Sequence, residues 1–231
     1  MLSKSLIDIL FLQETKLDDS FPHSQFQVQN YVLYRKDVTS NCGGLMALVR
    51  SDLPQRRRHD LESYETKSGR VEILVIELML KKEKWLLCSI YKQPKVKDGE
   101  FVNILDKVVG SLSANICNFV LIGDFNVNVF KDNHCLREFF QINGLRNKVT
   151  VPTCFKSNTP TCIDLIVTNV FKRIHHVSCF DNNLSDFHHM ICFSTKFHVP
   201  TFNRHAMTYR SYKHFNEEKY LNDLSYVPFH V

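Results

Sequence analysis

The fold is decided by Phe119-Val120-Leu121-Ile122-Gly123-Asp124-Phe125-Asn126, in which four apolar residues lead into an acid and an amide. A short apolar run of this kind, closed by a turn residue, predicts a buried strand. Similar runs recur between polar turns, and we predict strands over residues 7–12, 31–34, 45–49, 71–80, 85–91, 119–122, 163–167 and 190–193.

Two segments have the spacing of a helix instead. Within residues 100–112, one face carries Phe101, Ile104, Leu105, Val108, Val109 and Leu112. Residues 133–143 repeat this pattern and end at Asn143-Gly144, a suitable helix stop. Many strands with a few helices laid outside them predict the α/β (α+β) class, in the form of a β-sandwich flanked by helices.

The bulk composition limits the classes to which the chain can belong. With 231 residues, 44% of them apolar, it can bury one sizeable core, and 18 Phe against 7 Gly and 7 Pro argue against disorder. There is no run of about 18 apolar residues, so we expect no membrane span. The N-terminal stretch lacks a signal-peptide cleavage site, so we expect a protein of the nucleus, the cytoplasm or both that is not secreted.

Cysteines and charge give weaker indications. The eight cysteines form no C-x-x-C pair, which favours free thiols in a reducing compartment over disulfides or zinc. The net charge of +5 suits a polyanion partner without requiring one. The run Arg56-Arg57-Arg58-His59 has two interpretations, a phosphate contact or, more often for such runs, a solvated loop.

The character of the sequence changes near position 197. Proline and polar residues interrupt the apolar pattern there, and we predict one domain over residues 1–196 and a tail or linker over residues 197–231. Farther along, Asn216 precedes two acids and predicts the cap of a short helix over residues 219–224.

Acids stand at the ends or edges of four predicted strands, namely Glu14, Asp124, Asp164 and Asp186. A carboxylate beside a buried strand is costly to desolvate unless it is paired, hydrogen-bonded or bound to a cation. Each acid taken alone is also explained by a polar loop that begins where a strand ends. Together the four favour one cleft in which oxygen ligands hold a hard divalent ion such as Mg²⁺.

A cleft of this composition suits phosphodiester hydrolysis. A metal ion neutralises charge on the phosphoryl oxygens and on the leaving oxygen. An Asp or Asn places the attacking water, and an imidazole held by a carboxylate contacts the phosphate. His188 and His189 are candidates for that imidazole, although each taken alone is more typical of a surface histidine at the start of a strand.

Four motifs match, in order and approximate spacing, the endonuclease/exonuclease/phosphatase superfamily: Leu12-Gln13-Glu14-Thr15-Lys16, Gly123-Asp124-Phe125-Asn126, Ile163-Asp164-Leu165-Ile166 and Ser185-Asp186. More narrowly, the chain resembles the apurinic-endonuclease-like domain of non-LTR retrotransposons. Gly43-Gly44-Leu45 and Pro152-Thr153-Cys154-Phe155 resemble that branch, and Tyr209-Arg210-Ser211-Tyr212-Lys213 resembles its linker toward a reverse transcriptase. The resemblance implies a DNase-I-like sandwich of two sheets.

The resemblance also implies roles in binding. Glu14 and Asp186 correspond to ligands of a metal ion, Mg²⁺ or Mn²⁺. Tyr91 corresponds to a tyrosine that contacts the phosphate. DNA is the implied substrate, and the full-length element would supply a reverse transcriptase domain.

The remaining matches belong to the catalytic group. Asp124 corresponds to the acid that handles the attacking water, and Asn126 to the amide that helps to hold the phosphate. Asp164 corresponds to the acid that orients the catalytic histidine. Asp186 belongs to the terminal Ser-Asp-His motif.

The chain departs from the family pattern at two places. Only Met1 to Leu6 precede the strand that leads to Glu14, so we expect the first strand of the family, with its Asn, to be missing. In Ser185-Asp186-Phe187-His188-His189, Phe187 falls at the usual His position. Adjacent side chains of an extended segment face opposite ways, so the hypothesis that His188 replaces the usual His requires a slip of one residue.

Three functions remain open at this point. The first is an endonuclease that nicks one DNA strand and exposes a 3′-hydroxyl for reverse transcription, with basic residues such as Arg56 to Arg58 holding the duplex. The second is a truncated or co-opted remnant that binds nucleic acid or protein without catalysis. The third keeps the fold and changes the substrate to a phosphoinositide, a sphingolipid head group or an RNA tail.

Overall fold

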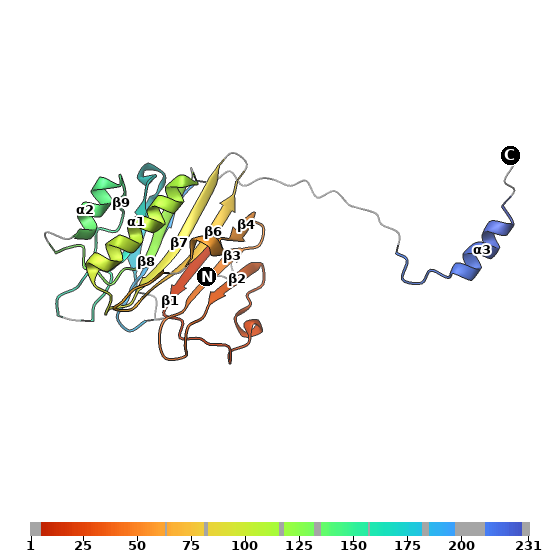
Figure 1. Ribbon diagram of the computed structural model, residues 1–231, viewed down its shortest axis with the longest axis horizontal. Coiled ribbons are helices and arrows are strands. Elements are labelled where there is room, and N and C mark those ends of the chain that lie inside the picture. The colour runs from red at the N-terminus through yellow and green to blue at the C-terminus, as the bar shows by residue number, and fades with distance from the viewer. Residues whose placement is uncertain are drawn as a thin grey trace. The chain divides into compact units, whose positions relative to one another are not determined.

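The predicted run 119–122 forms the centre of strand β8, which lies in the middle of a seven-stranded sheet (Figure 1). The strand order is β4-β6-β7-β8-β10-β9, with β5 also paired to β6. All neighbours are antiparallel except β7 and β8, which are parallel. The bounds are β4 Gln55–Arg57, β5 Tyr64–Glu65, β6 Arg70–Met79, β7 Lys84–Lys92, β8 Asn118–Asp124, β9 Arg146–Asn147 and β10 Asp164–Thr168.

The structure is a computed structural model, and it describes residues 6–62, 64–80, 83–115, 118–131, 135–156, 158–181, 185–196 and 211–227. The chain divides into two units, 1–200 and 201–231. Each unit is described by itself.

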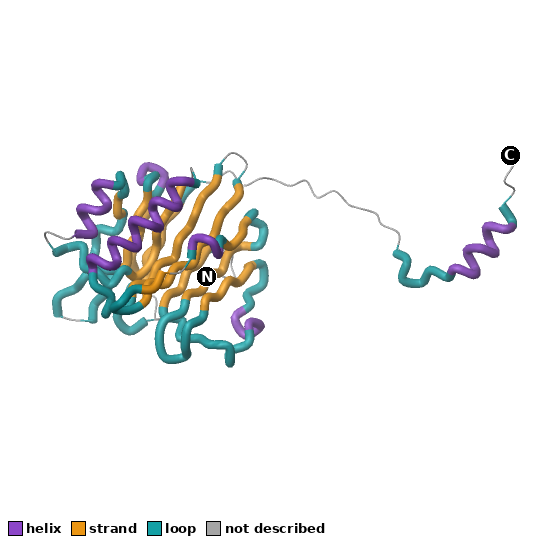
Figure 2. The backbone as a smooth tube through the Cα atoms, viewed as in Figure 1, coloured by secondary structure: helices purple, strands orange, loops and turns teal. Residues whose placement is uncertain are grey.

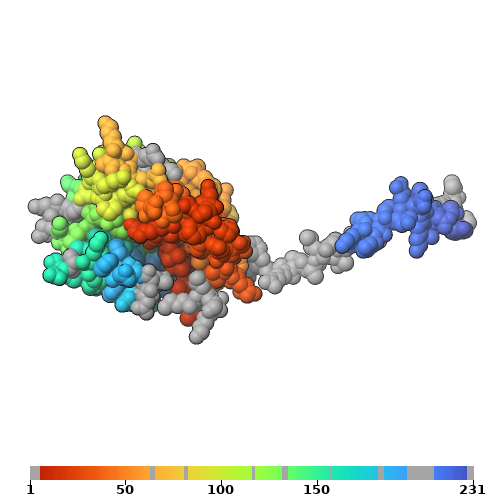
Figure 3. Space-filling model, turned by 90° about the horizontal axis from the view of Figure 1, so that it is seen from below, coloured from red at the N-terminus to blue at the C-terminus, as the bar shows by residue number. Residues whose placement is uncertain are grey.

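Two smaller sheets complete the first unit. One has the order β1-β3-β2, formed by Ile9–Gln13, Leu45–Arg50 and Tyr31–Lys36, and the other pairs β11 (His175–Phe180) with β12 (Met190–Ser194). β1 is an edge strand, and no strand of the described chain pairs with its free side. In Figure 3 the N-terminal segments in red and orange and the segment around β11 in blue are exposed on the same face.

The helix α1 (Asp98–Ala114) and the β1 sheet cover opposite faces of the seven-stranded sheet. Ser89 of β7 accepts a hydrogen bond of 2.8 Å from the side-chain amide of Gln13. Lys92 of the same strand lies with its ammonium 5.9 Å from the ring centre of Phe101 in α1. Because alternate residues of a strand point to opposite faces, Ser89 and Lys92 identify the two layers. Figure 2 shows α1 and the second helix, α2 (Cys135–Ile142), in purple beside the orange strands.

The predicted fold class is confirmed, because several sheets pack in layers and are flanked by helices. Every predicted strand is present, and both predicted helices form, although residues 133–134 lie outside the described chain. The sequence did not predict β4, β5, β9 or β11. The first three are two or three residues long and largely polar, and β11 begins with two exposed histidines, so none of them carries a continuous apolar signal.

Short 3-10 helices occur in the described connections at His23–Phe26, His59–Leu61 and Phe171–Arg173. The seven described cysteines are free thiols, and Cys88, Cys154 and Cys162 among them are buried. Cys117 lies outside the described residues.

Most of the basic run at positions 56–58 lies in a strand, and its charges are paired with acids. Arg56 and Arg57 belong to β4, not to a solvated loop. Their guanidinium groups pair with Glu77 and Glu62, both at 2.7 Å, and Arg58 pairs with acids as well. The other interpretation of this run, a phosphate contact, stays a prediction.

The second unit is described only over residues 211–227, which contain helix α3 (Glu217–Ser225). The predicted cap is confirmed, since the side chain of Asn216 accepts a hydrogen bond of 2.9 Å from the backbone N–H of Lys219. The rest of the predicted tail, including Tyr209-Arg210, lies outside the described residues. Among the helices described in either unit, none has the length and apolar character that crossing a membrane requires.

Candidate active site

The register of the large sheet places four side chains of the site in one row. Tyr91 of β7 pairs with Asp124 of the parallel strand β8, and Asp164 of β10 pairs with Asp124 from the other side. On β6, Glu72 pairs with Tyr91. Side chains at paired positions lie on the same face of a sheet, so three carboxylates and a phenol come together from four separate strands.

Glu14 joins this row from the other sheet. It follows directly after β1, which is tied to β7 through the hydrogen bond between Gln13 and Ser89. The hydroxyl of Tyr91 donates a hydrogen bond to the carboxylate of Glu14. Glu14 has a φ of 53°, a left-handed conformation that is uncommon for a residue other than glycine.

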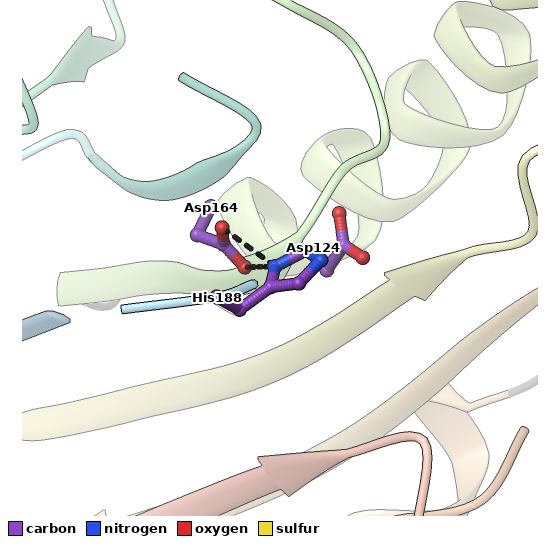
Figure 4. Close-up of side chains that lie close together, drawn as sticks. All are labelled: Asp124, Asp164 and His188. Carbon is purple, nitrogen blue, oxygen red and sulfur yellow. Dashed lines mark hydrogen bonds and ion pairs between the residues drawn. The ribbon is translucent and has the colours of Figure 1, made fainter. Parts of the chain in front are cut away.

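His188 completes the group from a loop before β12. The ring nitrogen Nδ1 of His188 lies 3.1 and 3.2 Å from the two carboxylate oxygens of Asp164. Figure 4 shows the imidazole between Asp164 and Asp124, with dashed lines to Asp164. The ligand atoms of these three residues lie within 4.8 Å of one another.

Pairing with a loop that is distant in sequence decides that His188, and not Phe187, faces the site. Cys154 pairs with His188, and the backbone N–H of His189 donates to the carbonyl of Thr153 at 2.8 Å. This register turns His188 toward Asp164. Phe187, which falls at the usual His position when the motif is aligned without a gap, is 44% exposed and does not face Asp164.

Two hydrogen bonds hold Asn126 against Asp124, and a third ties it to Lys92. Its backbone N–H and its side-chain amide donate to the two oxygens of Asp124 at 2.8 and 3.0 Å, and the amide also donates to the carbonyl of Lys92 at 2.8 Å. Asn126 has a φ of 46°. The amide therefore positions the carboxylate of Asp124, a contact that the sequence did not indicate.

Burial and mutual repulsion shift the acid–base properties of the site. Asp124 is 7% exposed, and burial, followed by the negative charge of Asp164, raises its pKa well above the ordinary value. The hydrogen bond to Asp164 raises the pKa of His188 against the opposing effect of burial. A buried acid with a raised pKa beside a histidine held by a second acid is an arrangement suited to proton transfer.

The residues at the site differ in two ways from those predicted from the sequence. Asp186 is exposed and lies outside the Asp124–Asp164–His188 cluster, so the structure does not bring it together with the other acids. Glu72, which was not predicted, lies beside Tyr91 and is 1% exposed. The signal was present in the sequence, because Glu72 interrupts the apolar run 71–80 and a buried acid requires a partner.

The acids present are chemically suited to a divalent cation. Burial raises the pKa of Tyr91. The negative charges of the neighbouring acids Glu14, Asp124 and Glu72 raise it further. One oxygen of Glu72 is buried and has no hydrogen-bond partner among the described residues. Carboxylate oxygens are the ligands that hard divalent ions prefer, and a cation would offset this concentration of buried negative charge.

The sequence profile of the endonuclease/exonuclease/phosphatase family matches residues 1–186. The chain belongs to this family. No curated protein sequence matches it. The resemblance stated from the motifs is thus confirmed at the level of the family.

Solved structures give the same fold. The endonuclease domain of TRAS1, a telomere-specific non-LTR retrotransposon, superposes with a TM-score of 0.65 at 15% identity, over 85% of this chain and 88% of that chain. The catalytic domain of Xenopus laevis APE2 gives 0.62 at 17% identity, over 88% of each chain. The 3′ phosphatase NExo from Neisseria, bound to a product DNA hairpin, gives 0.62 at 17% identity, over 85% of this chain and 91% of that chain. At these identities the likeness shows the DNase-I-like, apurinic-endonuclease-like fold alone.

Proposed function

We propose that the chain is a metal-dependent phosphodiesterase domain that nicks one strand of DNA, as a retrotransposon endonuclease does to prime reverse transcription. The observation that carries this proposal is the position of His188. Its Nδ1 lies beside Asp164 and its ring lies next to Asp124, at the ends of two adjacent strands. The family and the fold support the same class of chemistry.

Each residue of the cluster has a task in hydrolysis. Asp124 accepts a proton from the attacking water, and its raised pKa makes it a stronger base for that step. Asn126 holds Asp124 in place through its hydrogen bonds. Asp164 fixes the ring of His188, which then presents its other nitrogen to the phosphate.

Mg²⁺ or Mn²⁺ is the cofactor that we propose for this site. Glu14 would hold it, and the hydroxyl of Tyr91 fixes the carboxylate of Glu14 through a hydrogen bond. When bound, such an ion neutralises charge on the phosphoryl oxygens and on the leaving oxygen. Asp186 is a weaker candidate ligand because it is exposed.

A plasmid-nicking assay tests the proposal. The full chain is incubated with supercoiled plasmid and Mg²⁺, Mn²⁺ or EDTA, and wild type is compared with Asp124→Asn. We expect nicking that requires the metal and that falls by about 100-fold or more in the variant, the usual range for loss of a general base. Equal nicking by the two proteins would overturn the proposal.

A second candidate is a domain that binds nucleic acid or protein without cutting. The exposed position of Asp186 favours it, since an exposed acid holds a metal ion less firmly than a buried one that is fixed by partners. The two candidates differ in one experiment, in which DNA binding is measured by a gel shift beside the nicking assay. A wild type that shifts DNA and does not nick it with either metal would favour the second candidate.

A further inference from the structure

Glu72 is a buried acid whose hydrogen bonding is incomplete. It lies in the interior of β6 and is 1% exposed. One carboxylate oxygen, Oε2, accepts a hydrogen bond of 2.7 Å from the backbone N–H of Gly44. The other oxygen, Oε1, is buried without a hydrogen-bond partner among the described residues.

The partner of Glu72 belongs to a two-glycine loop, Gly43-Gly44, that directly precedes β3. Both glycines have a positive φ, of 72° and 94°. A Cβ atom on Gly43 would lie 2.3 Å from Oε1 of Glu72, so any side chain at this position would displace the carboxylate. Gly43 therefore leaves the space that the head group of Glu72 occupies, and Gly44, where a Cβ atom would lie 2.4 Å from Oγ1 of Thr15, leaves space for the segment after Glu14.

The opposite side of the same loop holds the backbone that carries Glu14. The carbonyl of Gly44 accepts a hydrogen bond of 3.2 Å from the N–H of Thr15, and the carbonyl of Gly43 accepts one of 2.8 Å from the N–H of Lys16. Glu14 and Lys16 both have a positive φ, of 53° and 52°. Two left-handed residues within three positions persist only where their surroundings hold them.

The contacts close into a ring around the site. Glu14 accepts a hydrogen bond from Tyr91, and Tyr91 lies directly across from Glu72 in the register of β6 and β7. From Glu72 the ring runs through Gly44 and Thr15 to Glu14, and back through Tyr91. Every step is a hydrogen bond, a peptide link or a strand pairing.

Stability alone does not explain a carboxylate at this position. A buried acid with one unsatisfied oxygen costs free energy, and an apolar residue of similar volume would fit the interior of β6 without that cost. Groups of this kind are found where function requires them. Arg70 and Lys36 act on the charge of Glu72, but its hydrogen bond goes to the Gly43-Gly44 loop, so we look for its function there.

We propose that Glu72 is a positioning residue for the metal ligand Glu14. It fixes the Gly43-Gly44 loop, and the loop fixes the left-handed backbone that turns Glu14 toward Tyr91. This inference rests on the proposed function, since it assumes that Glu14 binds a metal ion. It adds a residue that acts on the metal site through two intermediates and without contact to the metal.

The test compares two substitutions of Glu72 with a matched substitution on the same strand. Glu72→Leu removes the acceptor for the N–H of Gly44, whereas Glu72→Gln keeps an acceptor oxygen and removes the charge. Glu77→Leu is the control, because Glu77 is equally buried, on the same strand, but pairs with arginines. Mn²⁺ binding to each full chain is followed by the EPR signal of the free ion, and urea unfolding verifies that each variant is folded.

We expect Glu72→Leu to weaken Mn²⁺ binding by about 10- to 100-fold, the usual effect of losing a residue that orients a metal ligand. Glu72→Gln and Glu77→Leu should bind Mn²⁺ nearly as wild type does. Equal binding by Glu72→Leu and wild type would overturn the inference alone. Equal losses in Glu72→Leu and Glu72→Gln would overturn it too, since the charge and not the acceptor would then matter. A wild type that binds no Mn²⁺ would overturn the proposed function itself.

Discussion

Glu72 and Glu77 lie on the same strand and are equally buried, each 1% exposed, but they have different partners. Glu77 accepts hydrogen bonds from the guanidinium groups of Arg56 at 2.7 Å and Arg58 at 3.2 Å. Glu72 has one backbone N–H, from Gly44, on one oxygen and no described partner on the other. The two acids are five positions apart.

The difference indicates that Glu77 stabilises the fold, whereas Glu72 belongs to the candidate active site. Charged partners replace the hydration that a carboxylate loses on burial. At the Glu77 end of β6 that replacement is made by arginines from β4 and the residue after it. At the Glu72 end it is incomplete, and the same end of the sheet carries Tyr91, Asp124 and Asp164.

The largest expected effect is on DNA nicking, which should depend on residues at the Glu72 end of β6 and not on those at the Glu77 end. Replacing His188, the partner of Asp164, by Ala should reduce nicking by about 100- to 1,000-fold, as expected for loss of a hydrogen-bond donor that stabilises charge developing on the phosphate. Replacing Arg58, a partner of Glu77, by Ala should leave nicking per folded molecule unchanged. The plasmid assay measures both, with protein concentration corrected for the folded fraction.

Phe187→Ala is the matched control for His188→Ala. Its side chain is 44% exposed and adjacent in the chain, so its loss should leave nicking close to that of wild type. A large loss in Phe187→Ala together with full activity in His188→Ala would show that the histidine facing Asp164 has no part in catalysis.

A second expected effect is on the free energy of unfolding, which should respond differently to the loss of Glu77 and of Glu72. Glu77→Leu leaves Arg58, whose side chain is 15% exposed, without its buried acceptor. We expect it to lower the free energy of unfolding by about 1–3 kcal/mol, the range for a partly exposed ion pair that loses one member. Glu72→Leu should lower it less, because the substitution removes the buried oxygen that has no hydrogen-bond partner among the described residues, which offsets the loss of the acceptor for the N–H of Gly44. Urea unfolding measures both, and an equal loss in the two variants would erase the distinction.

The smallest expected effect is on the pH dependence of the free energy of unfolding, to which Glu72 and Glu77 contribute with opposite sign. Burial would raise the pKa of Glu77, but the hydrogen bonds from Arg56 and Arg58 bring it below the ordinary 4.5. Its ionised form therefore stabilises the fold above that pH, and this stability is lost as pH falls through the lower pKa of the folded state. Burial raises the pKa of Glu72 above 4.5, so its contribution is complete below 4.5 and is lost as pH rises through the folded value.

Isosteric variants make that difference measurable. The free energy of unfolding is followed against pH for wild type, Glu72→Gln and Glu77→Gln. The advantage of wild type over Glu77→Gln should shrink as the solution is acidified below 4.5. Relative to Glu72→Gln, wild type should lose stability as pH rises from 4.5. Shifts of the same sign in both pairs would contradict the comparison.

The sequence by itself determined the strands, the two helices of the first unit, the family and the residues that carry its motifs. These depend on local information, because a buried strand needs a continuous apolar run and an amphipathic helix needs an apolar stripe. The position of Asp124 directly after such a run already placed it at a strand end. The same logic failed for short polar strands such as β4, which form only because a neighbouring strand pairs with them.

Only the tertiary structure decided how distant residues meet. His188 faces Asp164 because a loop at Cys154 sets its register, and a one-residue slip exchanges the side chains on the two faces of an extended segment. Likewise, Glu72 and Glu77 are both acids in one apolar run. Their partners, Gly44 for one and arginines for the other, are separated from them in sequence and are fixed only when the sheets assemble.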